Sequence, residues 1–303
     1  MRQLIVLGFV GLVAQLIDGS LGMAYGVTSS TLLLAAGVAP AAASAAVHFS
    51  EIGTSLVSGF SHHKLGNVDW RTVSILALPG FIGAFLGATV LVSLDAAIAK
   101  PIVAVILLSL GVYVVYRFLV LGGRRPTFKS RPSARFLAPM GLVGGTLDAI
   151  GGGGWGPVGT TTLLSSGRLE PRKVIGSIDT SEFVVAVGGS LGFLIALGSQ
   201  GINWGYAGAL LAGGVIAAPI AAWLVRHLPA QVLGVAAGGL IVVTNIRTLL
   251  DVAGAPTALF ASTMAAALLA WALGIVWVVR QTRSARLLAV EAESGRVREF
   301  EPA

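Results

Sequence analysis

The sequence predicts an all-α polytopic membrane protein built from two inverted-topology repeats. Hydrophobic residues make up 55% of the chain and charged residues 11%, and the mean hydropathy is +0.87. A soluble protein of 303 residues could not bury that much apolar surface. The chain also repeats itself, because Gly141-Leu142-Val143 restarts, about 130 positions later, a pattern that Gly11-Leu12-Val13 begins. An internal duplication in a strongly apolar chain is typical of membrane transporters.

Each repeat opens with a segment of about 30 residues, near 2–36 and near 136–166, that an acid and several glycines interrupt. Neither piece of these segments is comfortably long enough to cross about 30 Å of hydrocarbon. Each segment is therefore predicted to be a re-entrant hairpin of two short helices, which a membrane tolerates only when it is buried in protein or lines a cavity. Three apolar spans follow each hairpin, and one further helix closes the chain. The predicted spans lie near 42–61, 72–94, 97–120, 173–198, 204–225, 231–250 and 257–280.

These segments divide the chain into membrane repeats and basic connections. The predicted parts are a first membrane repeat at 1–121, a basic cytoplasmic linker at 122–135, a second membrane repeat at 136–250, an additional C-terminal transmembrane helix at 251–281 and a charged cytoplasmic tail at 282–303.

The distribution of Lys and Arg predicts the orientation. Basic loops are cytoplasmic by the positive-inside rule. If both hairpins re-enter, only Arg2, Lys100 and Arg247 of the 20 basic residues lie outside. The two repeats then run in opposite directions, and the N-terminus is outside. A hairpin of two nearly full-length helices would place the loops on the same sides, so that alternative stays open.

The ionisable residues inside the apolar segments are few, and the repeat relates most of them in pairs. Asp18 corresponds to Asp148, and Glu51 corresponds to Glu182. A charge at membrane depth costs several kcal/mol unless it faces a cavity or a partner, so each acid is a functional candidate. Two structural alternatives are open: the aspartates can cap the second helix of each hairpin, and the glutamates can accept hydrogen bonds from glycine amides.

The neighbours of the paired glutamates differ. His48 lies one turn before Glu51, whereas Asp179 lies one turn before Glu182. A histidine at that spacing favours the charged form of a carboxylate, and an aspartate favours the protonated form. The sequence thus predicts that Glu182 holds the coupling proton and that His48 supplies a positive charge to the substrate.

The interrupted openings also predict an anion cradle. Glycines lie where each hairpin's second helix begins, and free amides at a helix N-terminus bind anions. Close helix packing is the alternative role for these glycines. The predicted substrate-binding residues are Gly22, Tyr25, Gly26, Ser29, His48, Ser50, Gly152, Gly153, Gly154, Trp155, Thr160 and Ser181, and the predicted proton-coupling residues are Glu51, Glu182, Asp18, Asp148 and Asp179.

Several other functions find little support in the sequence. The chain has no cysteine, and therefore no thiolate metal site. Residues 151–156 match G-x-G-x-x-G only weakly, because no βαβ unit surrounds them. No nucleophile–base constellation indicates an enzyme, and no cofactor or metal site is predicted. His62 and His63 are interpreted as a solvated cytoplasmic loop. The net charge of +7 comes from loops and tails, which argues against nucleic-acid binding.

The glycine-rich opening with its embedded acid, its second copy at 141–157 and the repeated Ser-Glu pair resemble the TauE/SafE family of sulfite and organosulfonate exporters. The resemblance covers roughly residues 5–250. It implies a multi-pass secondary carrier of the bacterial inner membrane, with a cytoplasmic C-terminus, that exports a small sulfur-containing anion such as sulfite, sulfoacetate or isethionate. We expect protons as the coupling ion, and membrane lipid and the anion as partners.

Two further function classes stay open alongside the anion exporter. One is a carrier of divalent metals or other cations that uses the intramembrane carboxylates. The other is a non-transporting membrane partner. A homo-oligomer is also left open, because the sequence does not decide the oligomeric state.

Overall fold

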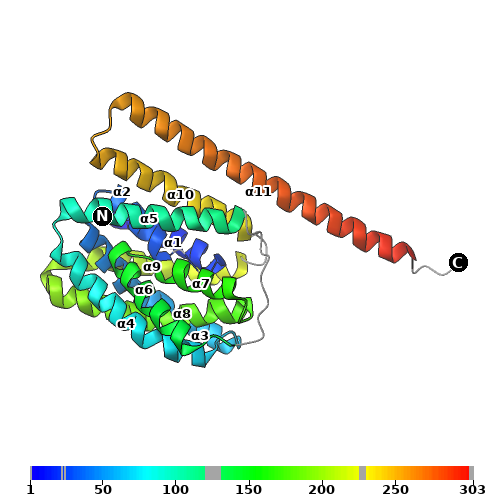
Figure 1. The fold of residues 1–303 in the computed structure, drawn as a ribbon, viewed down its shortest axis with the longest axis horizontal. Helices are drawn as coiled ribbons and strands as arrows, with labels where there is room; N and C mark the ends of the chain where they lie inside the picture. Colours follow the sequence, from blue (N-terminus) through cyan, green and yellow to red (C-terminus); the bar gives the residue numbers. More distant parts are fainter. Residues whose placement is uncertain (1, 22, 24, 120–130, 225–229, 300–303) are drawn as a thin grey trace.

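The computed structural model describes residues 2–21, 23, 25–119, 131–224 and 230–299, and this part of the chain forms eleven α-helices and no strand (Figure 1). The all-α class predicted from the sequence is confirmed. The helices are α1 (Arg2–Leu21), α2 (Tyr25–Ala35), α3 (Pro40–Lys64), α4 (Trp70–Ser93), α5 (Ala96–Leu119), α6 (Ala134–Gly151), α7 (Trp155–Ser166), α8 (Pro171–Leu197), α9 (Trp204–Leu224), α10 (Ala230–Val252) and α11 (Thr257–Glu299), with a short 3-10 turn at Ser199–Gly201.

Five of the predicted spans agree with helices that are long and apolar enough to cross a membrane in the described part of the chain. The helix α3 is long enough, at 25 residues, but its polar side chains leave it outside this group. Most of the predicted linker at 122–135 lies outside the described residues. The apolar helices are Trp70–Ser93, Ala96–Leu119, Lys173–Leu197, Gly234–Val252 and Thr257–Ser284.

The two openings are hairpins whose ends return to the same end of the bundle. In the second, the Arg168 guanidinium that follows α7 lies 5.4 Å from the ring of Phe136 at the start of α6. In the first, Leu7 of α1 and Val38 after α2 line one cavity of about 470 Å³. The prediction of two short helices is correct only for the second helix of each hairpin. By length, α1 and α6 reach about 30 and 27 Å, whereas α2 and α7 reach only about 16 and 18 Å.

The two repeats pack against each other through equivalent pairs of helices. The first helix of each repeat lies against the fourth helix of the other, so α1 packs on α9 and α6 packs on α4, while α3 contacts α8 and α5 contacts α10. This is the pattern of two units related by an approximate twofold axis. Glycines allow the close approach, because a Cβ at Gly145 would collide with the Gly80 carbonyl and one at Gly213 with the Gly8 carbonyl. That the repeats run in opposite directions across the membrane stays a prediction.

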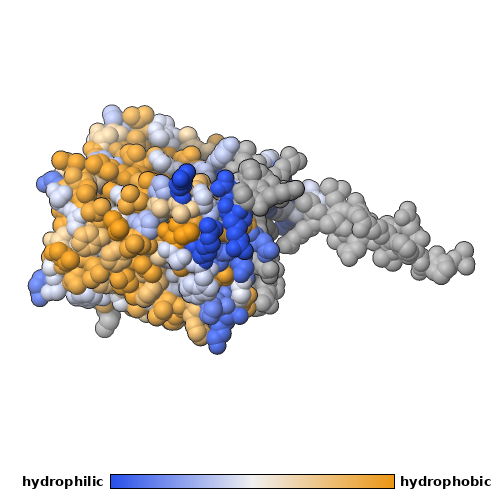
Figure 2. Space-filling model, turned by 60° about the horizontal axis from the view of Figure 1, so that its bottom comes forward, coloured by the Kyte–Doolittle hydropathy of each residue, from blue (hydrophilic) through white to orange (hydrophobic). Residues whose placement is uncertain are grey.

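The surface is divided into an apolar belt and a polar end. Figure 2 shows apolar residues over most of one face, with the most hydrophilic residues gathered toward the side from which α11 projects. Contacts tie the predicted cytoplasmic loops together at one end of the bundle. Arg71 at the start of α4 donates to the Pro132 carbonyl at 3.2 Å, and Lys173 of α8 donates to the Val68 carbonyl at 3.0 Å. This gathering agrees with the basic-loop pattern on which the predicted topology depends.

Candidate functional site

The tips of the two hairpins meet inside the bundle. Gly152 adopts a left-handed conformation (φ 67°) that ends α6, and its carbonyl accepts a hydrogen bond from Ser30 Oγ of α2 at 2.6 Å. Gly153 lies directly against the backbone of Gly26 and Val27, where a Cβ would collide. Glycine at these positions therefore lets two helix starts, one from each repeat, approach backbone to backbone.

Asp18 and Asp148 cap the second helix of their hairpins. Asp148 Oδ1 accepts hydrogen bonds from the amides of Gly154 (2.6 Å) and Trp155 (2.9 Å), and Asp18 Oδ1 accepts one from the Tyr25 amide (3.2 Å). Such carboxylates satisfy the unpaired amides of a helix N-terminus and favourably meet its positive end. Three of the amides on which the predicted anion cradle relied are therefore already donated to carboxylates, and an anion would have to displace them.

His48 is paired with the second repeat rather than directed at the glutamate one turn away. Its Nδ1 donates to the Ser44 carbonyl at 3.0 Å, and its Nε2 lies 3.3 Å from Asp148 Oδ2. The ring is fully buried against Phe193 and fits beside Gly189, where a Cβ would collide with it. His48 thus joins α3 to the capping carboxylate of α7, and the predicted role as a free substrate-facing cation does not fit this geometry.

Glu51 is the acid at the centre of the hairpin junction. Its side chain is 1% exposed, both carboxylate oxygens lack a hydrogen-bond partner, and Oε1 lies against Gly26. Its carboxylate lies with His48 Nε2 and an Asp148 oxygen in a cluster whose atoms are all within 4.8 Å of one another. A buried carboxylate without a donor is costly as an anion, so this position suits the neutral acid.

Glu51 forms one wall of a polar space that we call the acidic cleft. Four helices contribute to it, and among the described residues no lysine or arginine lines it. Its walls approach so closely that no room is left for a water-sized sphere. The cleft is therefore closed in this structure, and passage of an ion requires its walls to separate. The lining residues are Gln15 and Asp18 of α1, Tyr25 of α2, Glu51, Thr54, Ser55 and Ser58 of α3, and Asp179 and Glu182 of α8.

The acids of α8 differ from Glu51 because they accept hydrogen bonds from hydroxyl groups of α3. Ser55 Oγ donates to Glu182 Oε2 at 3.2 Å, and Ser58 Oγ donates to Asp179 Oδ2 at 2.9 Å. The predicted non-equivalence of Glu51 and Glu182 stays a prediction, and this difference in hydrogen-bond donors is a second basis for it beside the different residues at i−3.

The other predicted substrate-binding residues are buried, and several of them use their polar atoms in hydrogen bonds within the protein. Tyr25 Oη contacts Ser50 Oγ at 3.0 Å and donates to the Leu210 carbonyl at 3.2 Å, so it links α2, α3 and α9. The Trp155 indole and the Ser181 hydroxyl both donate to the Ile178 carbonyl. Ser29 and Thr160 are also fully buried, and Gly22 lies outside the described residues.

Five residues near the acids escaped the sequence analysis. Gln15, Thr54, Ser55 and Ser58 line the cleft, and His62 contacts Asp179. The four residues on α3 could have been found from the sequence, because positions three, four, seven and eleven residues after Glu51 lie close to the same helical face.

The interpretation of His62 as part of a solvated loop was wrong. The helix α3 continues to Lys64, and His62 Nε2 lies 3.3 Å from Asp179 Oδ2 with its side chain 23% exposed. His62 is beyond the predicted span at 42–61. Burial disfavours its charged form, but the hydrogen bond and negative charge of Asp179 outweigh burial and raise the pKa of His62 above the ordinary 6.5.

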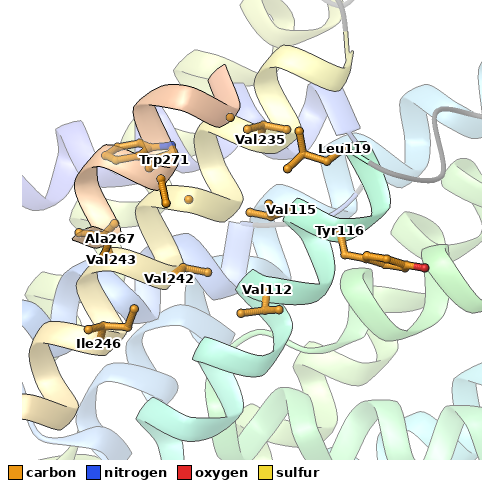
Figure 3. A pocket seen from close by; sticks show the side chains of 13 residues that line it. Val112, Val115, Tyr116, Leu119, Val235, Val242, Val243, Ile246, Ala267 and Trp271 are labelled. Carbon is orange, nitrogen blue, oxygen red and sulfur yellow. The ribbon is translucent and has the colours of Figure 1, made fainter. Parts of the chain in front are cut away.

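A separate apolar cavity of about 500 Å³ lies between α5, α10 and α11 (Figure 3). Val112 and Tyr116 of α5, Val242 of α10 and Trp271 of α11 are among its walls, and it holds no carboxylate or histidine. This composition suits contact with lipid chains. Among the residues that line these two spaces, the titratable groups are therefore in the acidic cleft and not in this apolar cavity.

Apolar helices, two hairpins meeting inside the bundle and buried acids along one cleft define a polytopic membrane transporter. Residues 7–248 match the sequence profile of the family described as "Sulfite exporter TauE/SafE". The chain belongs to the TauE/SafE family.

Two curated proteins are similar to it. One is the "Probable membrane transporter protein YtnM" of Bacillus subtilis (strain 168), which is 51% identical over 92% of this chain and 91% of its own length. The other is a "Probable membrane transporter protein" of Haemophilus influenzae, which is 25% identical over 47% of this chain and 52% of its own length. No solved structure matches the chain significantly.

Proposed function

We propose that the protein is a proton-coupled secondary transporter of the bacterial inner membrane that exports a small sulfur-containing anion, either sulfite or an organosulfonate such as sulfoacetate or isethionate. Membership of the TauE/SafE family supports the substrate class. The observation that carries the coupling is Glu51, a buried carboxylate without a hydrogen-bond donor at the junction of the two hairpins.

The cleft can recognise an anion only after its acids take up protons. Charged Glu51 and Glu182 would repel the substrate, and no lysine or arginine of the described residues lines the cleft to offset them. A protonated carboxyl group carries no charge and donates one hydrogen bond. Protonation therefore changes both glutamates from repelling groups into donors. Proton and anion then bind together.

This coupling is compatible with export. If only one of the two glutamates exchanges its proton during transport, a divalent anion and that proton together carry one negative charge outward. The membrane potential, negative inside, drives such movement with about 2.3 kcal/mol per charge and 100 mV. Alternating access would come from movement of one repeat against the other, which opens the closed cleft to either side.

A cation carrier is the second candidate, and one observation favours it. His48, Glu51 and Asp148 place potential ligand atoms within 4.8 Å of one another, and the Ser44 carbonyl fixes the His48 ring with Nε2 directed to the cluster. A transported divalent cation could bind there as substrate. One Asp148 oxygen already accepts hydrogen bonds from two amides at the start of α7, which argues against this role.

A ligand screen by thermal unfolding separates the two candidates. The purified protein is tested with sulfite, sulfoacetate, isethionate, taurine, sulfate, Mn²⁺ and Zn²⁺, beside Glu51→Gln and the exposed control Asp251→Asn. We expect a sulfur-containing anion to stabilise the wild type and the control, more strongly as pH falls. Stabilisation by a metal alone, lost in Glu51→Gln and kept in Asp251→Asn, would establish the cation carrier instead.

A further inference from the structure

A polar stripe runs along α3 from the hairpin junction to the end of the helix that carries the basic loops. Glu51, Ser55, Ser58 and His62 succeed one another at spacings of four, three and four residues, which places them near one helical face. Leu56, Val57 and Phe60 of this part of α3 are apolar and exposed. The stripe is therefore directed into the protein, while an apolar face of α3 is exposed.

The stripe is matched by the acids of α8 in antiparallel order. Ser55 donates to Glu182 at 3.2 Å, Ser58 donates to Asp179 at 2.9 Å, and His62 lies 3.3 Å from the same Asp179 oxygen. Titratable and hydrogen-bonding groups of both helices thus lie together from His62 to the acidic cleft. Exposure changes along them, since Glu51 is 1% exposed, Asp179 5% and His62 23%.

The closed cleft suggests a function for the polar stripe of α3 and the acids of α8 that contact it. The cleft leaves no room for a water-sized sphere, so its polar side chains themselves offer a route for a proton from the basic end to Glu51. Building on the proposed proton coupling, we propose that His62 and Asp179 form the cytoplasmic entry of a side-chain path that exchanges protons between the cytoplasm and Glu51 by way of Glu182.

The step along this path is a sequence of proton transfers without other chemistry. Cytoplasmic water gives a proton to His62, which passes it to Asp179. The proton then moves from Asp179 to Glu182 and from Glu182 to Glu51, which line the same cleft, when these side chains rotate toward one another. Release of a proton from Glu51 to the cytoplasm follows the same steps in reverse.

The surroundings of His62 suit this entry role. From α8 it faces Asp179, from α1 Asp18 acts at longer range, and from the following loop the Asn67 side chain lies 3.5 Å from Nδ1. Both charged groups are acids, so they favour the imidazolium form. A histidine in this environment holds a proton more readily than a free imidazole and has a carboxylate beside it to which the proton can pass.

The test follows the proton on Glu51 and requires no substrate. Infrared spectra of reconstituted membranes record the carbonyl stretch of protonated carboxylic acids, and the component that disappears in Glu51→Gln belongs to Glu51. After rapid transfer into D2O, its shift reports the exchange rate. We expect His62→Ala to slow this exchange on the order of a hundredfold, the lower end of what a positioned proton donor contributes. Added imidazole should restore the rate.

His63→Ala is the matched control, because His63 is the exposed neighbour that stacks on Trp70 instead of contacting an acid. It should exchange like the wild type, and Asp179→Asn should be slow without rescue by imidazole. Unchanged exchange in a folded His62→Ala protein would overturn the path and leave the proposed function standing. If the wild type shows no carboxylic acid component from Glu51, both the proposed coupling and the path fail.

Discussion

Replacing Gly152 with alanine should destabilise the protein by about 2–5 kcal/mol, because two penalties act at this position. The residue has a left-handed backbone (φ 67°), which costs an L-residue about 1–2 kcal/mol. The new methyl group would also collide with the Ser30 side chain across the hairpin junction, and overpacking costs about 1–3 kcal/mol more.

Gly37→Ala is a control that isolates the junction. Gly37 also has a positive φ, 86°, but nothing lies within 4 Å of an added Cβ, so only the backbone penalty of about 1–2 kcal/mol is expected there. Denaturant titrations in detergent micelles, followed by tryptophan fluorescence, measure both losses. Equal losses for Gly152→Ala and Gly37→Ala would refute the close contact between the two hairpins.

Two other predictions concern the caps and the topology. Asp148→Ala should lower the unfolding free energy by about 3–5 kcal/mol, because it removes the partner of His48 and the oxygen that accepts hydrogen bonds from two amides. Asp148→Asn loses the charge but keeps an oxygen acceptor, so it should cost clearly less, and equal unfolding free energies for the two variants would exclude the amide hydrogen bonds as a cause. The chain has no natural cysteine, so single cysteines report sidedness directly: a membrane-impermeant thiol reagent added to intact cells should label Ser199→Cys but not Ser133→Cys. The reverse labelling would invert the topology.

The sequence alone was sufficient for the fold class and the family, whereas the inverted orientation of the repeats and the roles of the acids stay predictions. Periodicity and hydropathy describe each segment separately, which is why the hairpins and the paired glutamates could be predicted. The second helix of each hairpin is indeed short, and the aspartates have the capping role that was weighed as an alternative.

The hydrogen-bond and ion-pair partners of the buried polar groups could not be predicted from the sequence pattern. Spacing along one helix placed His48 beside Glu51, and the structure adds Asp148 of α6 as a second acid, 3.3 Å from His48. His62 was assigned to a loop because its contact with Asp179 depends on how α3 packs on α8. Contacts between repeats decide which acid has a donor, and these contacts arise only from the tertiary structure.

Proton movement during organosulfonate efflux tests the central claim most directly. Isethionate or sulfoacetate suits this measurement, because the sulfonate stays ionised and does not carry the proton itself. In proteoliposomes that contain a pH-sensitive dye, the wild type should move protons together with the anion. Glu51→Gln mimics the protonated side chain permanently, and so should move the anion with a lower proton-to-anion ratio and a flatter dependence on pH. If Glu51→Gln keeps the wild-type ratio and the wild-type pH dependence, Glu51 does not carry the coupling proton.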